Sequence, residues 1–192
     1  MSTRSSPSVL ELRQYDARSY GDVLSAVGRL YAEVYQEPPY CEGADDAADF
    51  IAGMPRRAAQ PAFQMIVAIA DGEPVGFTFG HQLAPDTRWW EGAVSHIPES
   101  ITQENVGRTF AIIELAVSAT YRCRGIAKAM HDALIASRRE ERITLLVRPE
   151  AAPARTAYER WGYVRVGSIR PWPDAPLYDA MVLDLRRGGY RH

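Results

Sequence analysis

Hydrophobic positions in the first third of the chain follow a short alternation and then a longer period. Across residues 9–15 apolar and polar side chains alternate closely enough to predict a first strand. From about Tyr20, apolar residues recur every three or four positions until the Pro38–Pro39 pair ends the pattern, which predicts a helix. A second, short helix is expected after Gly43, with an apolar face made of Ala47, Phe50, Ile51 and Met54.

The middle of the chain predicts a β-hairpin followed by a long irregular segment. Residues 63–70 form an apolar run typical of a strand, 71–74 (Asp-Gly-Glu-Pro) are turn formers, and 75–81 would be the partner strand. The segment 82–108 follows neither the strand period nor the helix period. Loops of this length inside compact domains are usually functional or disordered.

The remainder of the chain switches between strand and helix patterns. Strands are predicted at 109–117, 143–147, 163–169 and 178–185, and helices at 125–139 and 153–161, with Gly162 ending the latter. The resulting order is β-α-α-β-β-β-α-β-α-β-β. We therefore predict a single-domain, mixed α+β fold with a mostly antiparallel central sheet of about seven strands flanked by about four helices. This domain would span 9–185, between a flexible N-terminus (1–8) and a C-terminal tail (186–192).

The charge and hydropathy of the chain argue against several classes of function. Its 192 residues are enough for one domain with a sizeable core. The 22 basic and 24 acidic residues give a formal charge of −2, without the basic character typical of nucleic-acid binding or polybasic membrane attachment. Residues 1–8 are polar, unlike a signal peptide, and the apolar run 111–117 is far too short to span a bilayer. We expect neither nucleic acid nor a membrane as a partner.

The two cysteines, Cys41 and Cys123, form neither a metal-ligand cluster nor a disulfide framework. Because disulfides are rare in the cytosol, we expect two reduced thiols in a cytoplasmic protein without a bound metal; the alternative is a Cys41–Cys123 disulfide.

The most informative stretch joins the strand that ends Glu-Leu-Ala-Val (114–117) to the helix that Gly125 opens. A helix N-terminus presents unpaired N–H groups and a partial positive charge, which suit a phosphate. Gly125 would let the backbone approach an anion closely, and Ala127 is also small. Nearby cations are Arg122, Arg124 and Lys128. These features favour a diphosphate-binding turn; the alternative is an ordinary glycine-containing helix start with surface arginines.

Two motifs resemble those of a known family. Arg-x-x-Gly-x-Ala at 122–127, five residues after a strand ending Leu-Ala-Val, resembles the acetyl-CoA-binding motif of the GNAT superfamily of N-acetyltransferases. Residues 154–163, Ala-Arg-Thr-Ala-Tyr-Glu-Arg-Trp-Gly-Tyr, resemble the second signature of that family, a helix and the strand after it. Both motifs occur in the structural context that the pattern predicts. The resemblance implies a GNAT-like fold and transfer of an acetyl group from acetyl-CoA to an amine.

The resemblance also implies roles for individual residues. The backbone of Leu115, Ala116 and Val117 would hydrogen-bond the pantetheine arm, much as a sheet edge pairs with a peptide. Amides of the following turn would bind the pyrophosphate; these belong to Arg122, Cys123, Arg124, Gly125, Ile126, Ala127 and Lys128. Tyr158 would lie near the cofactor sulfur and protonate the leaving thiolate, a task that suits a phenol. The alternative for Tyr158 is packing on its helix.

One position departs from the family pattern. Many members have an asparagine where this chain has Ala151. One polar contact to the cofactor is therefore expected to be missing or supplied elsewhere.

An amine must lose its proton before it attacks a thioester, so the site needs a base or a water chain. Glu114 is the first candidate, because alternation places it on the same strand face as Ala116, beside the cofactor strand. The alternative is a solvent-facing or salt-bridged carboxylate. His81 and His96 are weaker candidates, and His131 is expected to be structural.

The resemblance further implies that residues for the acceptor amine lie in the first two helices and in the loop before the cofactor strand. We select Tyr35, Trp89 and Trp90; other aromatic and acidic residues in these regions are Tyr31, Tyr40, Glu42, Asp45, Asp46 and Glu91. Aromatic rings together with carboxylates suit a cationic amine. The alternative is that the tyrosines are core residues and the acids cap a helix.

The sequence thus favours an N-acetyltransferase that acts on a small-molecule primary amine by direct attack in a ternary complex, as a monomer or homodimer. The alternatives are a protein or peptide N-acetyltransferase and a non-catalytic acyl-CoA-binding module, the last disfavoured by the presence of Tyr158.

Overall fold

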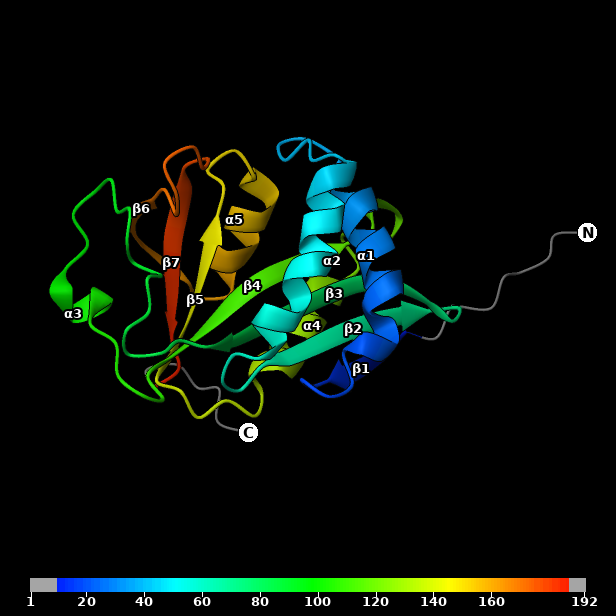
Figure 1. Ribbon diagram of the computed structural model, residues 1–192, viewed down its shortest axis with the longest axis horizontal. Helices are drawn as coiled ribbons and strands as arrows, with labels where there is room; N and C mark the ends of the chain where they lie inside the picture. Colours follow the sequence, from blue (N-terminus) through cyan, green and yellow to red (C-terminus); the bar gives the residue numbers. More distant parts are fainter. Residues whose placement is uncertain (1–9, 187–192) are drawn as a thin grey trace, which may run out of the picture. The chain divides into compact units, whose positions relative to one another are not determined.

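The computed structural model describes residues 10–186 (Figure 1). Its elements, in chain order, are β1 (Glu11–Tyr15), α1 (Gly21–Tyr35), α2 (Ala44–Ala58), β2 (Gln64–Ala70), β3 (Glu73–Gln82), α3 (Glu99–Thr102), β4 (Thr109–Val117), the 3-10 helix η1 (Ala119–Tyr121), α4 (Ile126–Ile135), β5 (Arg142–Val147), α5 (Ala152–Arg160), β6 (Val164–Ile169) and β7 (Tyr178–Asp184).

The seven strands are hydrogen-bonded in the order β1-β2-β3-β4-β5-β7-β6. β4 and β5 pair in parallel, whereas β1 with β2, β5 with β7 and β6 with β7 pair antiparallel. The predicted mixed α+β class, with a sheet of about seven strands, is therefore confirmed.

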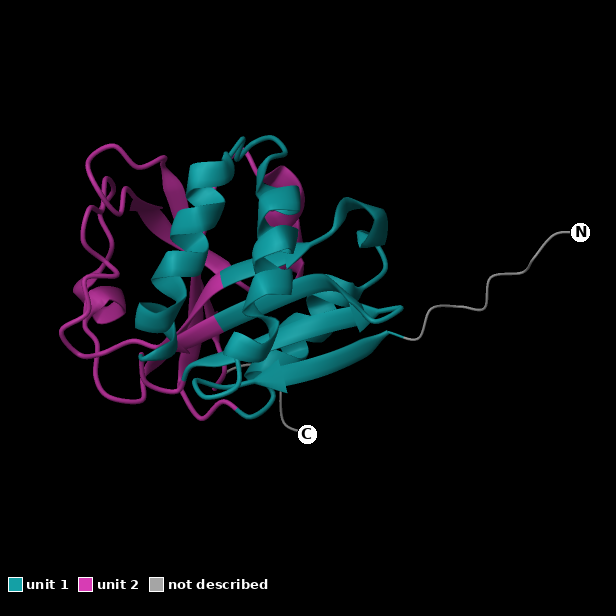
Figure 2. Ribbon diagram, turned by 45° about the vertical axis from the view of Figure 1, so that its right-hand side comes forward, with its two compact units in different colours: residues 1–59, 63–79, 114–137 teal, residues 60–62, 80–113, 138–192 magenta. Residues whose placement is uncertain are grey.

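The chain divides into two compact units (Figure 2). The described part of unit 1 comprises residues 10–59, 63–79 and 114–137, and that of unit 2 comprises 60–62, 80–113 and 138–186. β3 and β4 each begin in one unit and end in the other.

The strands of unit 1 carry helices on both faces. Phe77 and Phe79 of β3 pack against Phe50 of α2, with ring centroids 5.8 and 6.2 Å apart. Gly76 faces the opposite side, because a Cβ there would lie 2.9 Å from Cε of Met130 on α4. α1 lies beside α2 (Figure 1). The alternation of β3 thus separates α1 and α2 on one face from α4 on the other.

In unit 2, β7 lies between β5 and β6. The outer edge of β6 is met by the segment 92–95, where the N–H of Val94 donates to the carbonyl of Ser168 and the N–H of Arg170 to that of Gly92, each at 2.9 Å. Gly167 allows this approach, since a Cβ would lie 2.5 Å from the side chain of Ile97. Part of the long segment before β4 is therefore folded onto the sheet.

Several predicted boundaries were wrong for local reasons. The second helix is 15 residues long rather than short, and Ile51 is exposed rather than on its buried face. The turn before β3 consists of Asp71 and Gly72 alone, because both have positive φ (52° and 86°), so the strand begins at Glu73. The segment 82–108 contains the short helix α3, and α4 ends at Ile135. The predicted start of the first strand at Val9, the N-terminus 1–8 and most of the tail lie outside the described residues.

Over residues 10–186, no helix is long and apolar enough to cross a membrane. In the same range, no group of three or more His, Cys, Asp or Glu side chains could hold a metal ion.

Candidate active site

The turn between β4 and α4 in unit 1 has an open, left-handed N-cap. Gly125 adopts φ 79° and directly precedes Ile126, the first residue of α4. A Cβ on Gly125 would meet nothing within 4 Å, so the space beside this backbone is clear. The ten-residue helix therefore offers its first-turn N–H groups where an anion can approach them.

The three cations around this turn each have a protein partner. The Arg122 guanidinium donates from Nε to the carbonyl of Val117 at 3.0 Å and from Nη1 to Glu37 at 2.6 Å. The Arg124 guanidinium lies over the Tyr121 ring, 5.1 Å from its centroid. Lys128 forms an ion pair with Asp132 one helical turn away. Anion binding at this turn would therefore depend mainly on backbone N–H groups.

The other residues predicted for the cofactor occupy the same stretch. Ala116, Val117 and Ile126 are buried, with 4%, 8% and 4% of their surface exposed, so their side chains belong to the core. Leu115 and Ala127 are half-buried, and Cys123 is exposed with φ 60°. β4 pairs with β5 over Thr109–Ala111 and continues for six residues to Val117 beyond those pairs.

Glu114 of β4 lies in a hydrogen-bonded, largely buried position. The Tyr35 hydroxyl of α1 donates to its carboxylate, and the Thr78 hydroxyl donates to its backbone carbonyl at 2.7 Å. Burial raises the pKa of the Glu114 carboxyl to about 7; the negative charge of Glu42 acts in the same direction, while the Tyr35 hydrogen bond and the positive charge of Arg57 lower it. A carboxyl group with this pKa can exchange a proton near neutral pH.

A second phenol–carboxylate pair lies one helical turn from the first. The Tyr31 hydroxyl donates to Glu42 at 2.5 Å. The Tyr31 ring stacks on Phe50 at 4.1 Å and lies 4.4 Å from the Tyr35 ring, whose other side meets Tyr40 at 4.8 Å. Burial raises the pKa of the Tyr31 phenol, and the charges of Glu114 and Glu42 add to that effect, so the phenol remains a donor. Unit 1 thus brings together four aromatic rings and two carboxylates.

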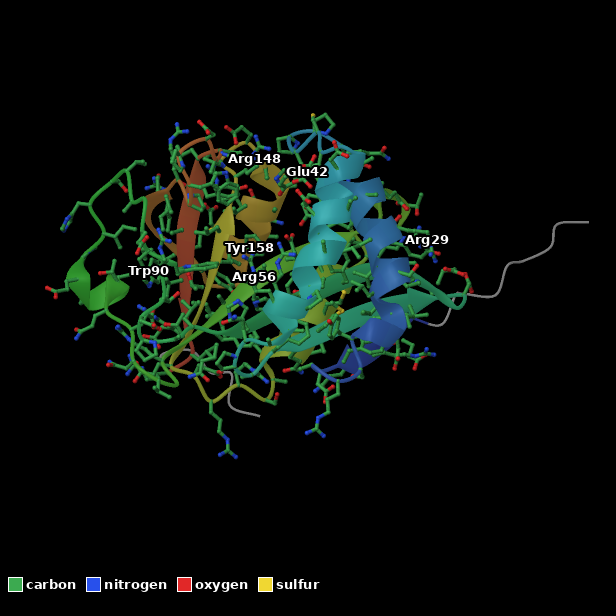
Figure 3. The ribbon with its side chains drawn as sticks, in the orientation of Figure 1. Arg29, Glu42, Arg56, Trp90, Arg148 and Tyr158 are labelled. Carbon is green, nitrogen blue, oxygen red and sulfur yellow. The ribbon has the colours of Figure 1, made fainter. Side chains whose placement is uncertain are left out.

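Tyr158 lies in unit 2, on α5 (Figure 3). It is 8% exposed, and its ring packs against Trp161 and Tyr163 with centroids 5.5 and 5.7 Å away. The helix begins as predicted, with proline in its first turn, and Gly162 follows it with φ 95°. Ala151, the position that departs from the family pattern, is buried and precedes this helix.

The two tryptophans selected for the acceptor have different surroundings in unit 2. Trp90 is 7% exposed and donates from Nε1 to Glu104 at 2.9 Å, beneath the Arg142 guanidinium at 5.5 Å from its ring. Arg142 pairs with Glu104 at 2.7 Å, so Trp90 belongs to a buried network. Trp89 packs against the buried hydrophobic cluster that Trp90 forms with Ile97, Ile169 and Ala180. Its indole N–H has no hydrogen-bond partner among the described residues. This environment favours a structural role for Trp90 and leaves its predicted contact with the acceptor, like that of Trp89, untested.

Of the two weaker candidates for the base, His96 is exposed, and Nδ1 of His81 lies 3.1 Å from the carbonyl oxygen of its neighbour Gln82, to which it donates when it carries the proton. His131 is fully buried on α4, and burial lowers its pKa, so it is neutral at pH 7.

Several residues of these networks were not selected from the sequence. They are Glu33 and Glu37, which contact the turn after β4, and Arg57, Thr78 and Glu104. No local motif distinguishes them, because each acts on a residue far away in the chain.

The comparisons with known proteins agree with the fold. Residues 26–163 match the acetyltransferase (GNAT) family, and the chain belongs to that family. It is therefore an acetyltransferase by class. No curated protein sequence matches the chain.

Solved structures of similar fold include both protein and small-molecule acetyltransferases. The ribosomal-protein-S18-alanine N-acetyltransferase from Escherichia coli has a TM-score of 0.61 and 15% identity, covering 96% of this chain and 99% of that one. The aminoglycoside acetyltransferase AAC(6')-Ib in complex with coenzyme A has a TM-score of 0.58 and 19% identity, covering 93% and 96%. The PaiA N-acetyltransferase from Thermoplasma acidophilum, also with coenzyme A, has a TM-score of 0.60 and 11% identity, covering 92% and 99%. At these identities the likeness concerns the fold.

Proposed function

We propose that this chain transfers an acetyl group from acetyl-CoA to a primary amine of a small molecule, by direct attack in a ternary complex. The observation that carries the proposal is the placement of Glu114, with its pKa raised to about 7, on the strand that leads into the Gly125 turn. A carboxyl group suited to accept a proton and a helix start suited to an anion thus occur in one unit, on consecutive parts of the chain.

The turn fits a coenzyme A diphosphate. The open side of Gly125 and the N–H groups of the first turn of α4 suit a phosphate held by backbone N–H groups. The backbone of Leu115–Val117 would hold the pantetheine arm, as the family resemblance implies. Acetyl-CoA would supply the activated acetyl thioester.

Glu114 would act as the general base. Its ionised carboxylate takes a proton from the acceptor ammonium, and the freed amine attacks the thioester carbonyl carbon. The C–N bond forms and the C–S bond breaks, and the departing thiolate takes a proton from Tyr158. The second proton, which the acetylated nitrogen loses, restores the Tyr158 phenol. The role of Tyr158 rests on its position in the second family motif.

The acceptor side favours a cationic amine. Tyr40 offers an aromatic surface beside the buried Tyr31 and Tyr35, and Glu42 and Glu114 offer negative charge in the same unit. A protein or peptide acceptor is the second candidate, because the solved structures of similar fold include an enzyme for ribosomal protein S18. We also infer a cytoplasmic location, which agrees with two unpaired, exposed cysteines.

Calorimetry with coenzyme A followed by a mass-spectrometric screen of amine acceptors tests this function. We expect coenzyme A to bind and a small cationic amine to gain 42 Da, the mass of one acetyl group replacing hydrogen. Binding of coenzyme A without any acetylated small molecule or peptide would favour the non-catalytic alternative. Absence of binding at millimolar coenzyme A would refute the proposal.

A further inference from the structure

Two acidic residues at the C-terminal end of α1 contact the turn that follows β4. Glu33 accepts a hydrogen bond from the Ser118 hydroxyl at 2.7 Å. Glu37, just beyond the helix, pairs with Arg122 at 2.6 Å. Both contacts lie within unit 1 and join residues 85 positions apart in the sequence.

The same arginine also closes the turn on itself. Arg122 donates from Nε to the carbonyl of Val117, at the end of β4, while its Nη1 reaches Glu37. The N–H of Ser118 donates to the carbonyl of Val75 on β3 at 2.9 Å. One guanidinium therefore connects the strand end, the turn and the end of α1.

An acidic side chain beside a diphosphate site is electrostatically unfavourable for the ligand. Glu37 is 37% exposed and could turn away into water, yet it pairs with the arginine that opens the glycine motif. The contacts give the Glu37 carboxylate a role that offsets its repulsion of the ligand. Glu37 fixes the side chain of Arg122, and Arg122 shapes the turn.

We infer that Glu37 is a positioning residue for coenzyme A, acting through Arg122 to hold the β4–α4 turn in its binding conformation. The inference rests on the proposed function, since it assumes that this turn binds the diphosphate. Holding the turn before the ligand arrives reduces the ordering cost of binding. Arg122 then acts as a structural clamp and its charge is not a phosphate ligand.

The alternative, in which the Arg122 side chain binds phosphate, predicts the opposite response to loss of Glu37. Without its carboxylate partner, Arg122 would be released toward the ligand and one repulsive charge would disappear, so affinity would rise. If Arg122 is a clamp, affinity falls. The sign of the change distinguishes the two roles.

The experiment is a double-mutant cycle on coenzyme A binding, measured by calorimetry at fixed ionic strength. We expect Glu37→Ala to weaken binding about three- to fivefold, which corresponds to the upper part of the range for an exposed ion pair. Arg122→Ala should weaken it at least as much, and the double variant should be no weaker than Arg122→Ala. In steady-state assays, KM for acetyl-CoA should rise while kcat at saturation stays unchanged.

Glu11→Ala is the matched control, because Glu11 also forms an exposed pair with an arginine, Arg13, at 2.8 Å, away from the turn. It should leave the affinity unchanged. Melting temperatures without ligand verify that each variant is folded.

A parent chain that binds coenzyme A together with a Glu37→Ala variant that binds as tightly or more tightly would overturn this inference alone. Additive effects of the two substitutions would also overturn it. A parent chain that does not bind coenzyme A would remove the proposed function and this inference together.

Discussion

The Tyr35 hydroxyl of α1 donates a hydrogen bond to the Glu114 carboxylate of β4, across 79 residues of sequence. The bond stabilises the ionised form of a carboxyl group whose burial stabilises the neutral form. The two opposing effects leave the pKa of Glu114 at about 7, so that near neutral pH the carboxylate can accept a proton from an amine.

The pH dependence of turnover should report Glu114. Its carboxyl must be ionised to accept a proton, and its pKa is about 7, so most molecules are inactive at pH 6 and most are active at pH 8. We expect kcat/KM for acetyl transfer to rise through a midpoint near pH 7. Glu114→Gln should lower kcat by about 10²- to 10⁴-fold and abolish this rise. A Glu114→Gln variant with the pH profile of the parent would assign the base to another group.

Tyr35→Phe should move the same midpoint to higher pH. The substitution removes the hydrogen bond that lowers the pKa of Glu114, while the ring can still pack against Tyr31 and Tyr40. A shift of about one pH unit is the scale expected for one hydrogen bond to a charged group. Tyr31→Phe serves as the comparison and should move the midpoint less, because its hydroxyl bonds Glu42 and interacts with Glu114 only through charge. The profile of kcat/KM against pH measures both variants; an unmoved midpoint in Tyr35→Phe would show that the pair does not set the pKa.

Sequence periodicity was sufficient for the fold but not for these contacts. The strands from β2 to β7 follow local apolar patterns, and α1 and α5 have the predicted proline and glycine signals, so their bounds were predicted to within a few residues. The length of α2 was missed: the helix continues past Met54, the last residue of the predicted apolar face, to Ala58, with Pro55 inside its last turn.

Side-chain partners depend on tertiary structure, which no local pattern encodes. Arg122 was assigned to the cofactor turn by its motif, but its pairing with Glu37 joins segments 85 residues apart. Trp90 and Trp89 look equivalent in sequence, yet only Trp90 has its N–H bonded within the described network. The motif therefore predicted the position of the turn. It did not predict which side chains of the turn already have partners within the protein.

Gly125 offers a matched pair of substitutions. Its φ of 79° disfavours most side chains, but asparagine and aspartate both tolerate this conformation and have nearly the same shape. We expect Gly125→Asp to weaken coenzyme A binding much more than Gly125→Asn, because only the carboxylate repels the diphosphate. Calorimetry with coenzyme A measures the ratio of the two affinities, and circular dichroism checks the fold. Equal affinities of the two variants would place the diphosphate away from this helix start.

Trp90→Ala should destabilise the chain. The substitution leaves a cavity in the cluster with Ile97 and Ile169 and removes a donor from the buried Glu104, already paired with Arg142. A loss of about 3–5 kcal/mol in the free energy of unfolding is expected for a buried tryptophan. Urea denaturation provides the measurement. Trp89→Ala is the comparison. A similar loss of unfolding free energy in Trp89→Ala, with no loss in Trp90→Ala, would contradict the assignment of Trp90 to the structural network.

Tyr158→Phe should lower kcat far more than it weakens acetyl-CoA binding. The Tyr158 ring packs against Trp161 and Tyr163, contacts that phenylalanine retains. What disappears is the proton donor proposed for the departing thiolate, a group required mainly in the transition state. General-acid catalysis by one residue is typically worth about 10²- to 10⁴-fold, and the loss should be found in kcat. Glu159→Gln, a charge-removing change at the next position of α5, controls for the helix, since Glu159 is exposed. If Tyr158 only packs, phenylalanine keeps nearly full turnover. A kcat within a few-fold of the parent, measured where the chemical step limits the rate, would therefore remove Tyr158 from the mechanism.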